Sequence, residues 1–170
     1  MHPWQQHLET LKAHFQPPGL ADAGTLRRLS GLEFLQKIIN GELPVAPITQ
    51  TLDFHLIEAE PGRAVFQGRP AHAHYNPIAT VHGGYHATLL DSAMACAVQT
   101  LCEAGRAYTT LEFKIHCVRA LTEAVGPVRA EGKVVSSSKR MATAEGRLVD
   151  SEGRLYSHGT TTCMLFELQG

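Results

Sequence analysis

The chain has 170 residues, 44% of them hydrophobic, which predicts one globular unit with enough chain to bury a core. Its 15 Lys and Arg residues against 16 Asp and Glu leave a net charge of −1, so neither a nucleic-acid surface nor a polybasic membrane patch is expected. The first residues lack a secretion signal, and the four cysteines lie far apart without a C-x-x-C pair. These features indicate a cytoplasmic protein with reduced thiols.

The N-terminal part is expected to be helical. Apolar residues recur with helical spacing and predict an amphipathic helix, for docking or an oligomer contact, at Trp4, Leu8, Leu11 and Phe15. A second short helix begins with a capping box formed by Ser30 and Glu33 and stops at Gly41. We therefore assign residues 1–47 to a helical extension and linker, and residues 48–170 to the main domain.

Alternating segments predict strands on both sides of a central helix. Two strands precede it, at 51–58 and 63–69, and four follow it, at about 108–119, 127–137, 140–150 and 154–166. The helix itself should end near residues 103–105. This order predicts an α+β fold, with an antiparallel sheet of about five to six strands wrapped around the helix.

The most informative segment is 75–101, YNPIATVHGGYHATLLDSAMACAVQTL. A turn at Asn76-Pro77 leads to His82-Gly83-Gly84, where a helix begins that is apolar almost all round and is therefore expected to be buried. The middle of this helix carries one carboxylate, Asp91, with no Lys or Arg within a helical turn. Because burying an unpaired charge is costly, Asp91 indicates a function.

The glycine pair suits a site that polarises a carbonyl oxygen. The free N–H groups of a first helical turn attract developing negative charge, and glycine lets a substrate oxygen approach. Asp91 would then be a general base or a nucleophile, with its pKa raised by apolar surroundings. The alternative is an ordinary core helix whose Asp91 is satisfied by the hydroxyl of Thr88 or Ser92.

The segment from Tyr75 to Val98 resembles the signature of hotdog-fold acyl-CoA thioesterases of the phenylacetate-pathway (PaaI-type) branch, an N-P-x-G-x-x-H-G-G loop followed by T-L-x-D-x-A. The resemblance covers residues 52–166, and Ala79 stands where many relatives have glycine. It implies a hotdog fold that hydrolyses an acyl-CoA substrate to a free acid and coenzyme A, with no metal or cofactor. It also implies a homodimer, often paired into a homotetramer.

On this resemblance, Asp91 activates water or attacks the thioester, and the Gly84 N–H polarises its carbonyl with help from Asn76 and His82. The family's hydroxyl position aligns with Thr110, although uninterrupted strand alternation favours Thr109 toward the helix.

Four further residues complete the expected substrate-binding set. Gly83 and Thr88 lie on the helix beside the catalytic residues. Lys139 and Arg140, at a turn between strands, are expected to bind the phosphates of coenzyme A. The alternative for this pair is a solvated hairpin tip.

Other chemistries fit the sequence less well. Histidines at 72, 74, 82 and 86 lack H-E-x-x-H spacing or a Cys partner, so no metal is expected, and no G-x-S-x-G elbow is present. A hotdog dehydratase or hydratase using His82 and Asp91 is one alternative, and a non-catalytic acyl-CoA binding protein is another. The acyl group stays open.

The helix geometry also predicts a shared site. Gly84 and Asp91 lie seven residues apart, or roughly 10 Å along the helix axis, which is farther than one Asp side chain can reach. Two antiparallel copies of the helix across a two-fold axis would place each N-terminus opposite the other copy's Asp91.

Overall fold

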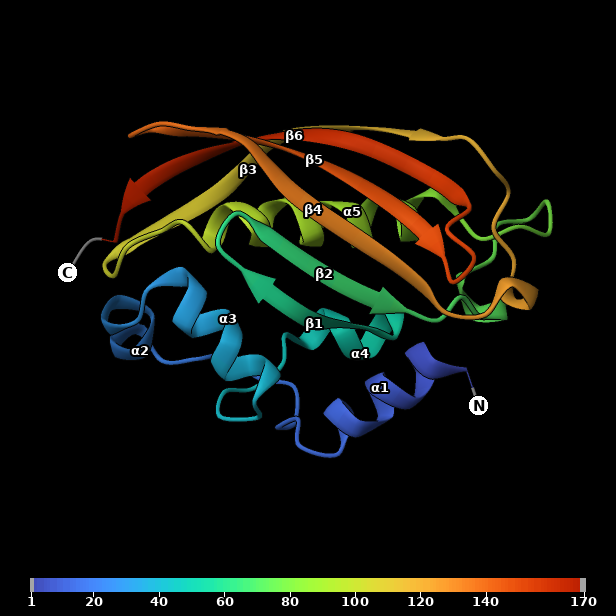
Figure 1. Cartoon of the computed structure of the whole chain (residues 1–170), viewed down its shortest axis with the longest axis horizontal. Coiled ribbons are helices and arrows are strands. Elements are labelled where there is room, and N and C mark those ends of the chain that lie inside the picture. Colours follow the sequence, from blue (N-terminus) through green and yellow to red (C-terminus); the bar gives the residue numbers. More distant parts are fainter. Residues whose placement is uncertain (1, 169–170) are drawn as a thin grey trace.

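The computed structural model of the chain describes residues 2–168. Helix α5 (Gly83–Gln99) lies under one curved, six-stranded antiparallel sheet, as Figure 1 shows. The strands are β1 (Phe54–Glu60), β2 (Arg63–Gly68), β3 (Arg106–Cys117), β4 (Val128–Ser137), β5 (Met141–Asp150) and β6 (Leu155–Glu167). Their order across the sheet is β1-β2-β4-β5-β6-β3, so β1 and β3 are its edges. The predicted α+β hotdog fold is confirmed.

Helix α5 packs closely against the sheet because both surfaces carry small residues. Leu89, Leu90 and Met94 are fully buried in the core between them. Gly132 on β4 is required at the closest approach, since a Cβ there would lie 2.3 Å from the carbonyl oxygen of Ala93. The helix therefore has a fixed position under the sheet, and its half-exposed side faces away from the central strands.

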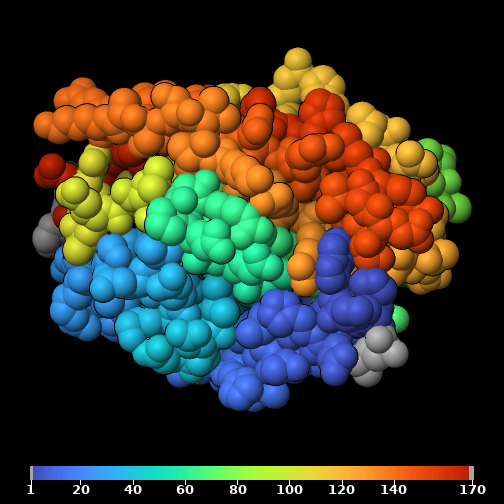
Figure 2. Space-filling view, in the orientation of Figure 1, coloured from blue at the N-terminus to red at the C-terminus, as the bar shows by residue number. Residues whose placement is uncertain are grey.

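The helices of the N-terminal part are α1 (Pro3–Lys12), α2 (Ala23–Arg28), α3 (Gly31–Ile39) and α4 (Pro47–Leu52). The two predicted helices are confirmed as α1 and α3, and the capping box of Ser30 and Glu33 is present. Figure 2 shows the N-terminal segments, blue to cyan, packed side by side against the strands β1 and β2. The domain boundary at residue 47 stays a prediction.

Helix α1 covers the face of β1 and β2 that points away from α5. Leu8 forms a small apolar cluster with Ile57 and Val65. The side-chain amide of Gln67 donates a hydrogen bond of 2.9 Å to the carbonyl of Trp4. The Trp4 ring in turn lies 4.3 Å from the guanidinium carbon of Arg129. These contacts close the outer surface of this half of the sheet.

The structure corrects two predicted boundaries. The first strand does not begin at residue 51, because Pro47 starts helix α4 and Thr49 donates a hydrogen bond of 2.7 Å to the carbonyl of Ala46. That helix ends at Asp53, whose φ of 44° turns the chain into β1. The central helix ends at Gln99, earlier than residues 103–105.

Among the helices of residues 2–168, none is long and apolar enough to cross a membrane.

Candidate active site

Asp91 lies half-buried in the middle of α5, and its one hydrogen-bond donor within residues 2–168 comes from the sheet. The hydroxyl of Thr110 on β3 donates to Oδ1 of Asp91 over 3.0 Å. No ion pair with Asp91 forms within residues 2–168, and burial raises the pKa of its carboxyl while the Thr110 hydrogen bond lowers it. The hydroxyl of Thr88 donates instead to the carbonyl of Gly84, at 2.9 Å. The neighbour that satisfies Asp91 is therefore Thr110, across the helix–sheet interface.

A bulge in β3 explains why Thr110 faces Asp91. The register of β3 against β6 shifts between Thr110 and Glu112, so the simple alternation of faces is interrupted there. Thr110 points to the helix before the bulge, and Thr109 is exposed on the other face. After the bulge, the odd-numbered Ile115 packs against the core, so the face that points to the helix changes from even-numbered to odd-numbered residues. The alternation that favours Thr109 assumes an unbroken strand, and this assumption is wrong.

At the start of α5, the two glycines differ in whether their N–H groups are bonded. His82 is the N-cap residue, and its Nδ1 accepts a hydrogen bond of 2.8 Å from the N–H of Gly84. The N–H of Gly83, the first helical residue, has no partner within residues 2–168. A side chain at position 83 would meet no heavy atom within 4 Å, whereas one at position 84 would lie 2.9 Å from Nδ1 of His82. The Gly83 N–H is thus open to a ligand, and the Gly84 N–H is already bonded.

Asn76 organises the loop that precedes the helix. Its amide nitrogen donates to the hydroxyl of Thr80 at 2.9 Å, and its Oδ1 accepts from the N–H groups of Ile78 and Thr80 at 3.0 and 3.2 Å. Ala79 holds φ at +63°, the left-handed conformation that glycine adopts at less cost. The loop therefore keeps its shape at Ala79, and both ends of the Asn76 amide are used within it.

A cavity of about 340 Å³ opens at this end of α5. Its polar lining comes from the loop, the first turn of α5 and the end of β3, and includes Asn76, Thr80, Gly83, His86 and Arg119. Asp91 and Thr110 are not part of the lining. Gly83 and Asp91 are eight residues apart, roughly 12 Å along the helix axis. Within one subunit, the predicted site residues therefore form two separate groups, one at the N-terminus of α5 and the other at Asp91 and Thr110.

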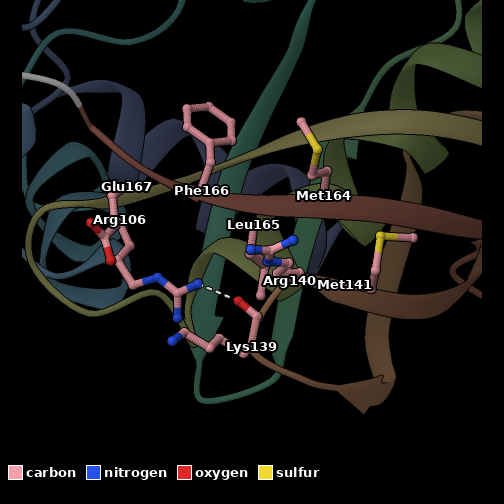
Figure 3. Close-up of a pocket in the computed structure, with 8 residues that line it drawn as sticks. All are labelled: Arg106, Lys139, Arg140, Met141, Met164, Leu165, Phe166 and Glu167. Carbon is pink, nitrogen blue, oxygen red and sulfur yellow. Dashed lines mark hydrogen bonds between the residues drawn. The ribbon is translucent and has the colours of Figure 1, made fainter.

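Lys139 and Arg140 border a second, larger groove of about 620 Å³ (Figure 3). Arg106 joins them there, and its guanidinium donates a hydrogen bond to the carbonyl of Lys139. Three cations and one carboxylate, Glu167, thus line a groove whose other walls include Met164 and Phe166. The sequence gives no signal for Arg106, because only the pairing of β3 with β6 brings it beside the turn after β4.

The clustered histidines have separate roles in the fold. The ring of His74 stacks on Tyr85 with centroids 4.4 Å apart, His82 caps α5, and His86 is buried against Ser157. Throughout residues 2–168, no group of three or more His, Cys, Asp or Glu side chains is arranged to hold a metal ion.

The fold and this arrangement define a hotdog protein with a helix-borne carboxylate. Residues 79–157 match the family model of the thioesterase superfamily. The TT0310 protein of Thermus thermophilus is 30% identical, with a TM-score of 0.64 over 71% of this chain and 97% of that one. A mutant of the phenylacetic acid degradation protein PaaI from the same organism is 29% identical, with a TM-score of 0.63 over 69% and 97% of the two chains.

A phenylacetic acid degradation-related protein of Ralstonia eutropha JMP134 has a TM-score of 0.70 at 24% identity, covering 77% of this chain and 98% of that one. A search of curated proteins gives no match. The chain belongs to the thioesterase superfamily, and it is similar to the PaaI-type hotdog proteins of that family.

Proposed function

We propose that the chain is an acyl-CoA thioesterase in which Asp91 is the general base or the nucleophile. The observation that carries this proposal is the half-buried carboxylate that has a raised pKa, no cation beside it within residues 2–168, and one oriented hydroxyl partner. As a base, Asp91 takes a proton from water, the hydroxide attacks the thioester carbon, and coenzyme A leaves with a proton. As a nucleophile, Asp91 attacks the thioester carbon and forms an anhydride while the C–S bond breaks and coenzyme A leaves as a thiolate that is then protonated; water cleaves the anhydride to the free acid and restores the carboxylate. Thr110 orients the carboxylate in either case.

The thioester carbonyl is placed at the N-terminus of α5. Gly83 supports this placement best, because its N–H is free whereas the Gly84 N–H donates to His82. The Gly84 N–H, expected from the sequence to be the donor, becomes available only when the His82 ring moves away. Asn76 contributes by holding the loop in place, since both ends of its amide are engaged there.

The proposed site combines two subunits. The roughly 12 Å between Gly83 and Asp91 is too long for both to act on one thioester within a chain. Strand β3 is a sheet edge of 12 residues with Leu111 and Phe113 exposed, which suits pairing with a second copy. Such a homodimer would place the α5 N-terminus of each copy opposite the partner's carboxylate, and the resemblance to hotdog thioesterases extends this to a homotetramer.

The cationic groove is the proposed place for the phosphates of coenzyme A. Lys139, Arg140 and Arg106 supply three positive charges against the single carboxylate of Glu167. Arg106 lies four residues before Thr110 on β3, roughly 13 Å along an extended strand. The flexible arm of coenzyme A can span that distance between the phosphates and the reacting carbon.

The test is Asp91→Asn, assayed by release of free thiol from a panel of acyl-CoA thioesters. Loss of a positioned base lowers the rate about 100- to 10,000-fold, while binding of a non-hydrolysable acyl-CoA analogue should persist. Hydration of an enoyl-CoA is measured in parallel, because a hydratase would consume that substrate without releasing thiol. Near-normal thiol release by the folded Asn variant would contradict the proposed mechanism, and tight binding without any turnover of the wild type would favour an acyl-CoA binding protein.

A further inference from the structure

The cavity at the N-terminus of α5 contains groups that the proposed hydrolysis does not use. Of the ten described residues that line it, Arg119 is the one cation and none is a carboxylate. His86 is also in the lining, although its side chain is almost fully buried, at 2% exposure. A buried imidazole beside a guanidinium is an unusual wall for a pocket that receives a plain hydrocarbon chain.

Ser157 is the hydrogen-bond partner of the His86 ring. Nδ1 of His86 lies 3.1 Å from Oγ of Ser157, which is fully buried. Which of the two groups donates depends on the tautomer of the ring: when the Ser157 hydroxyl donates to Nδ1, the proton of the neutral ring resides on Nε2. Burial lowers the pKa of His86, which keeps the ring neutral near pH 7.

Nε2 of His86 reaches the cavity. Nε2 has no hydrogen-bond partner among the described residues. Within residues 2–168, the side-chain atoms that are both unpartnered and sealed from solvent are Nδ1 of His55 and the hydroxyl oxygen of Tyr85. Nε2 of His86 is therefore not sealed from solvent. In the tautomer with the proton on Nε2, the ring presents a hydrogen-bond donor to the cavity, and Ser157 holds it in place from behind.

Two other side chains of the wall, those of Arg119 and Thr80, keep hydrogen-bond donors free. Arg119 donates from Nε to the carbonyl of Leu155, at 3.4 Å, and its guanidinium carbon lies 6.0 Å from the centroid of the Tyr156 ring. Its two terminal nitrogens have no hydrogen-bond partner within residues 2–168. The hydroxyl of Thr80 accepts from Asn76 and keeps its own proton to donate. Free donors in the wall, one of them cationic, are complementary to an acceptor that carries negative charge.

We propose that this cavity binds a carboxylate at the far end of the acyl group, and that His86 is the specificity-determining residue. The inference rests on the proposed thioesterase function, because Gly83 in the cavity wall places the thioester carbonyl at its mouth. The substrates are then acyl-CoA thioesters that end in a carboxylate. Water cleaves the C–S bond, so the products are a dicarboxylic acid and coenzyme A with its thiol protonated.

A matched pair of substrates tests the proposal on the full chain. Glutaryl-CoA and pentanoyl-CoA have the same chain length and differ in the terminal carboxylate, and omega-hydroxypentanoyl-CoA carries a hydroxyl there instead. The wild type should favour glutaryl-CoA by roughly 10- to 100-fold in kcat/KM, the range for hydrogen bonds to a charged group. An equal or greater kcat/KM for pentanoyl-CoA, or a preference for the hydroxyl substrate, overturns the proposal.

Variants of His86 separate recognition from structure. His86→Met keeps an apolar side chain of similar length without the donor and should lose the glutaryl preference, with pentanoyl hydrolysis unchanged. His86→Gln should restore part of the preference, because its amide can donate near the position of Nε2. His14→Met is the control, since His14 is exposed and lies outside the cavity lining. An equal loss on both substrates in His86→Met would indicate a structural role and overturn the proposal.

Nuclear magnetic resonance of the imidazole nitrogens gives a readout independent of turnover and of any variant's folding. Free glutarate should shift the Nε2 signal of His86 in the wild type, and pentanoate should shift it less. If glutarate shifts the signal while no thioester is hydrolysed, the proposed function fails and the carboxylate pocket stands. If thioesters are hydrolysed while glutarate leaves the signal unmoved, the pocket proposal fails alone.

Discussion

Replacing Gly83 by proline would remove one backbone N–H and little else. Gly83 is the first residue of α5, where proline fits, and His82 before it has φ −61° and ψ 140°, a conformation that proline tolerates in its predecessor. The N–H that is lost has no partner within residues 2–168. Removing one donor to a developing oxyanion costs about 2.7–4 kcal/mol, or roughly 100- to 1,000-fold in kcat. We expect Gly83→Pro to unfold at the temperature of the parent protein and to lose activity by that factor.

The matched control is Gly83→Ala, which keeps the N–H and adds a methyl group where no heavy atom lies within 4 Å. Both variants are assayed by thiol release at saturating acyl-CoA, with thermal unfolding as the check on folding. A kcat for Gly83→Pro within about threefold of that for Gly83→Ala would refute the assignment of the oxyanion donor. An equal loss in both variants would indicate crowding of the substrate, and the donor would then have to be sought at Gly84.

Two other predictions concern Asp91. The pKa of the Asp91 carboxyl is higher in the folded chain than its unfolded value of 3.8, so the folded chain holds the carboxyl proton more tightly. The contribution of Asp91 to the free energy of unfolding therefore falls as pH rises above 3.8. Asp91→Asn should therefore be at least as stable as the parent at pH 7, with the difference fading below about pH 4 in thermal unfolding, and a large destabilisation at pH 7 would contradict the argument. Mixing Asp91→Asn with Gly83→Pro subunits should restore roughly a quarter of wild-type activity, because half of the randomly paired dimers regain one of two sites. No recovery after verified subunit exchange, or an active monomer, would refute the shared site.

Local signals in the sequence were sufficient for most of the fold. The capping box at Ser30 and the periodicities of the strands are properties of short segments, and the structure confirms them. Helix α4 was missed because its signal, a proline at the first helical position, also fits an extended linker. The order of the strands could not be read from local patterns, and with it the position of Arg106 beside Lys139.

The candidate site depends more on tertiary geometry. The identity of the hydroxyl beside Asp91 depends on the bulge after Thr110, and an extra residue in one strand leaves no mark in hydrophobic alternation. Which glycine N–H is free depends on the rotamer of His82, whose ring takes the N–H of Gly84. Sequence reasoning could place a carboxylate and a helix start on one helix, but the partners of each polar group required the folded chain.

The N-terminal helix α1 divides the outer surface of the sheet into two unlike halves. The chain's own Trp4 and Leu8 seal the half formed by β1 and β2. The other half, formed by β5, β6 and β3, leaves Met141, Met164 and Phe166 open to solvent. A further subunit that approached the sheet from outside would meet a surface covered by α1 on one half and exposed apolar side chains on the other. Removing α1 would erase that asymmetry and offer a second place for such a subunit to dock.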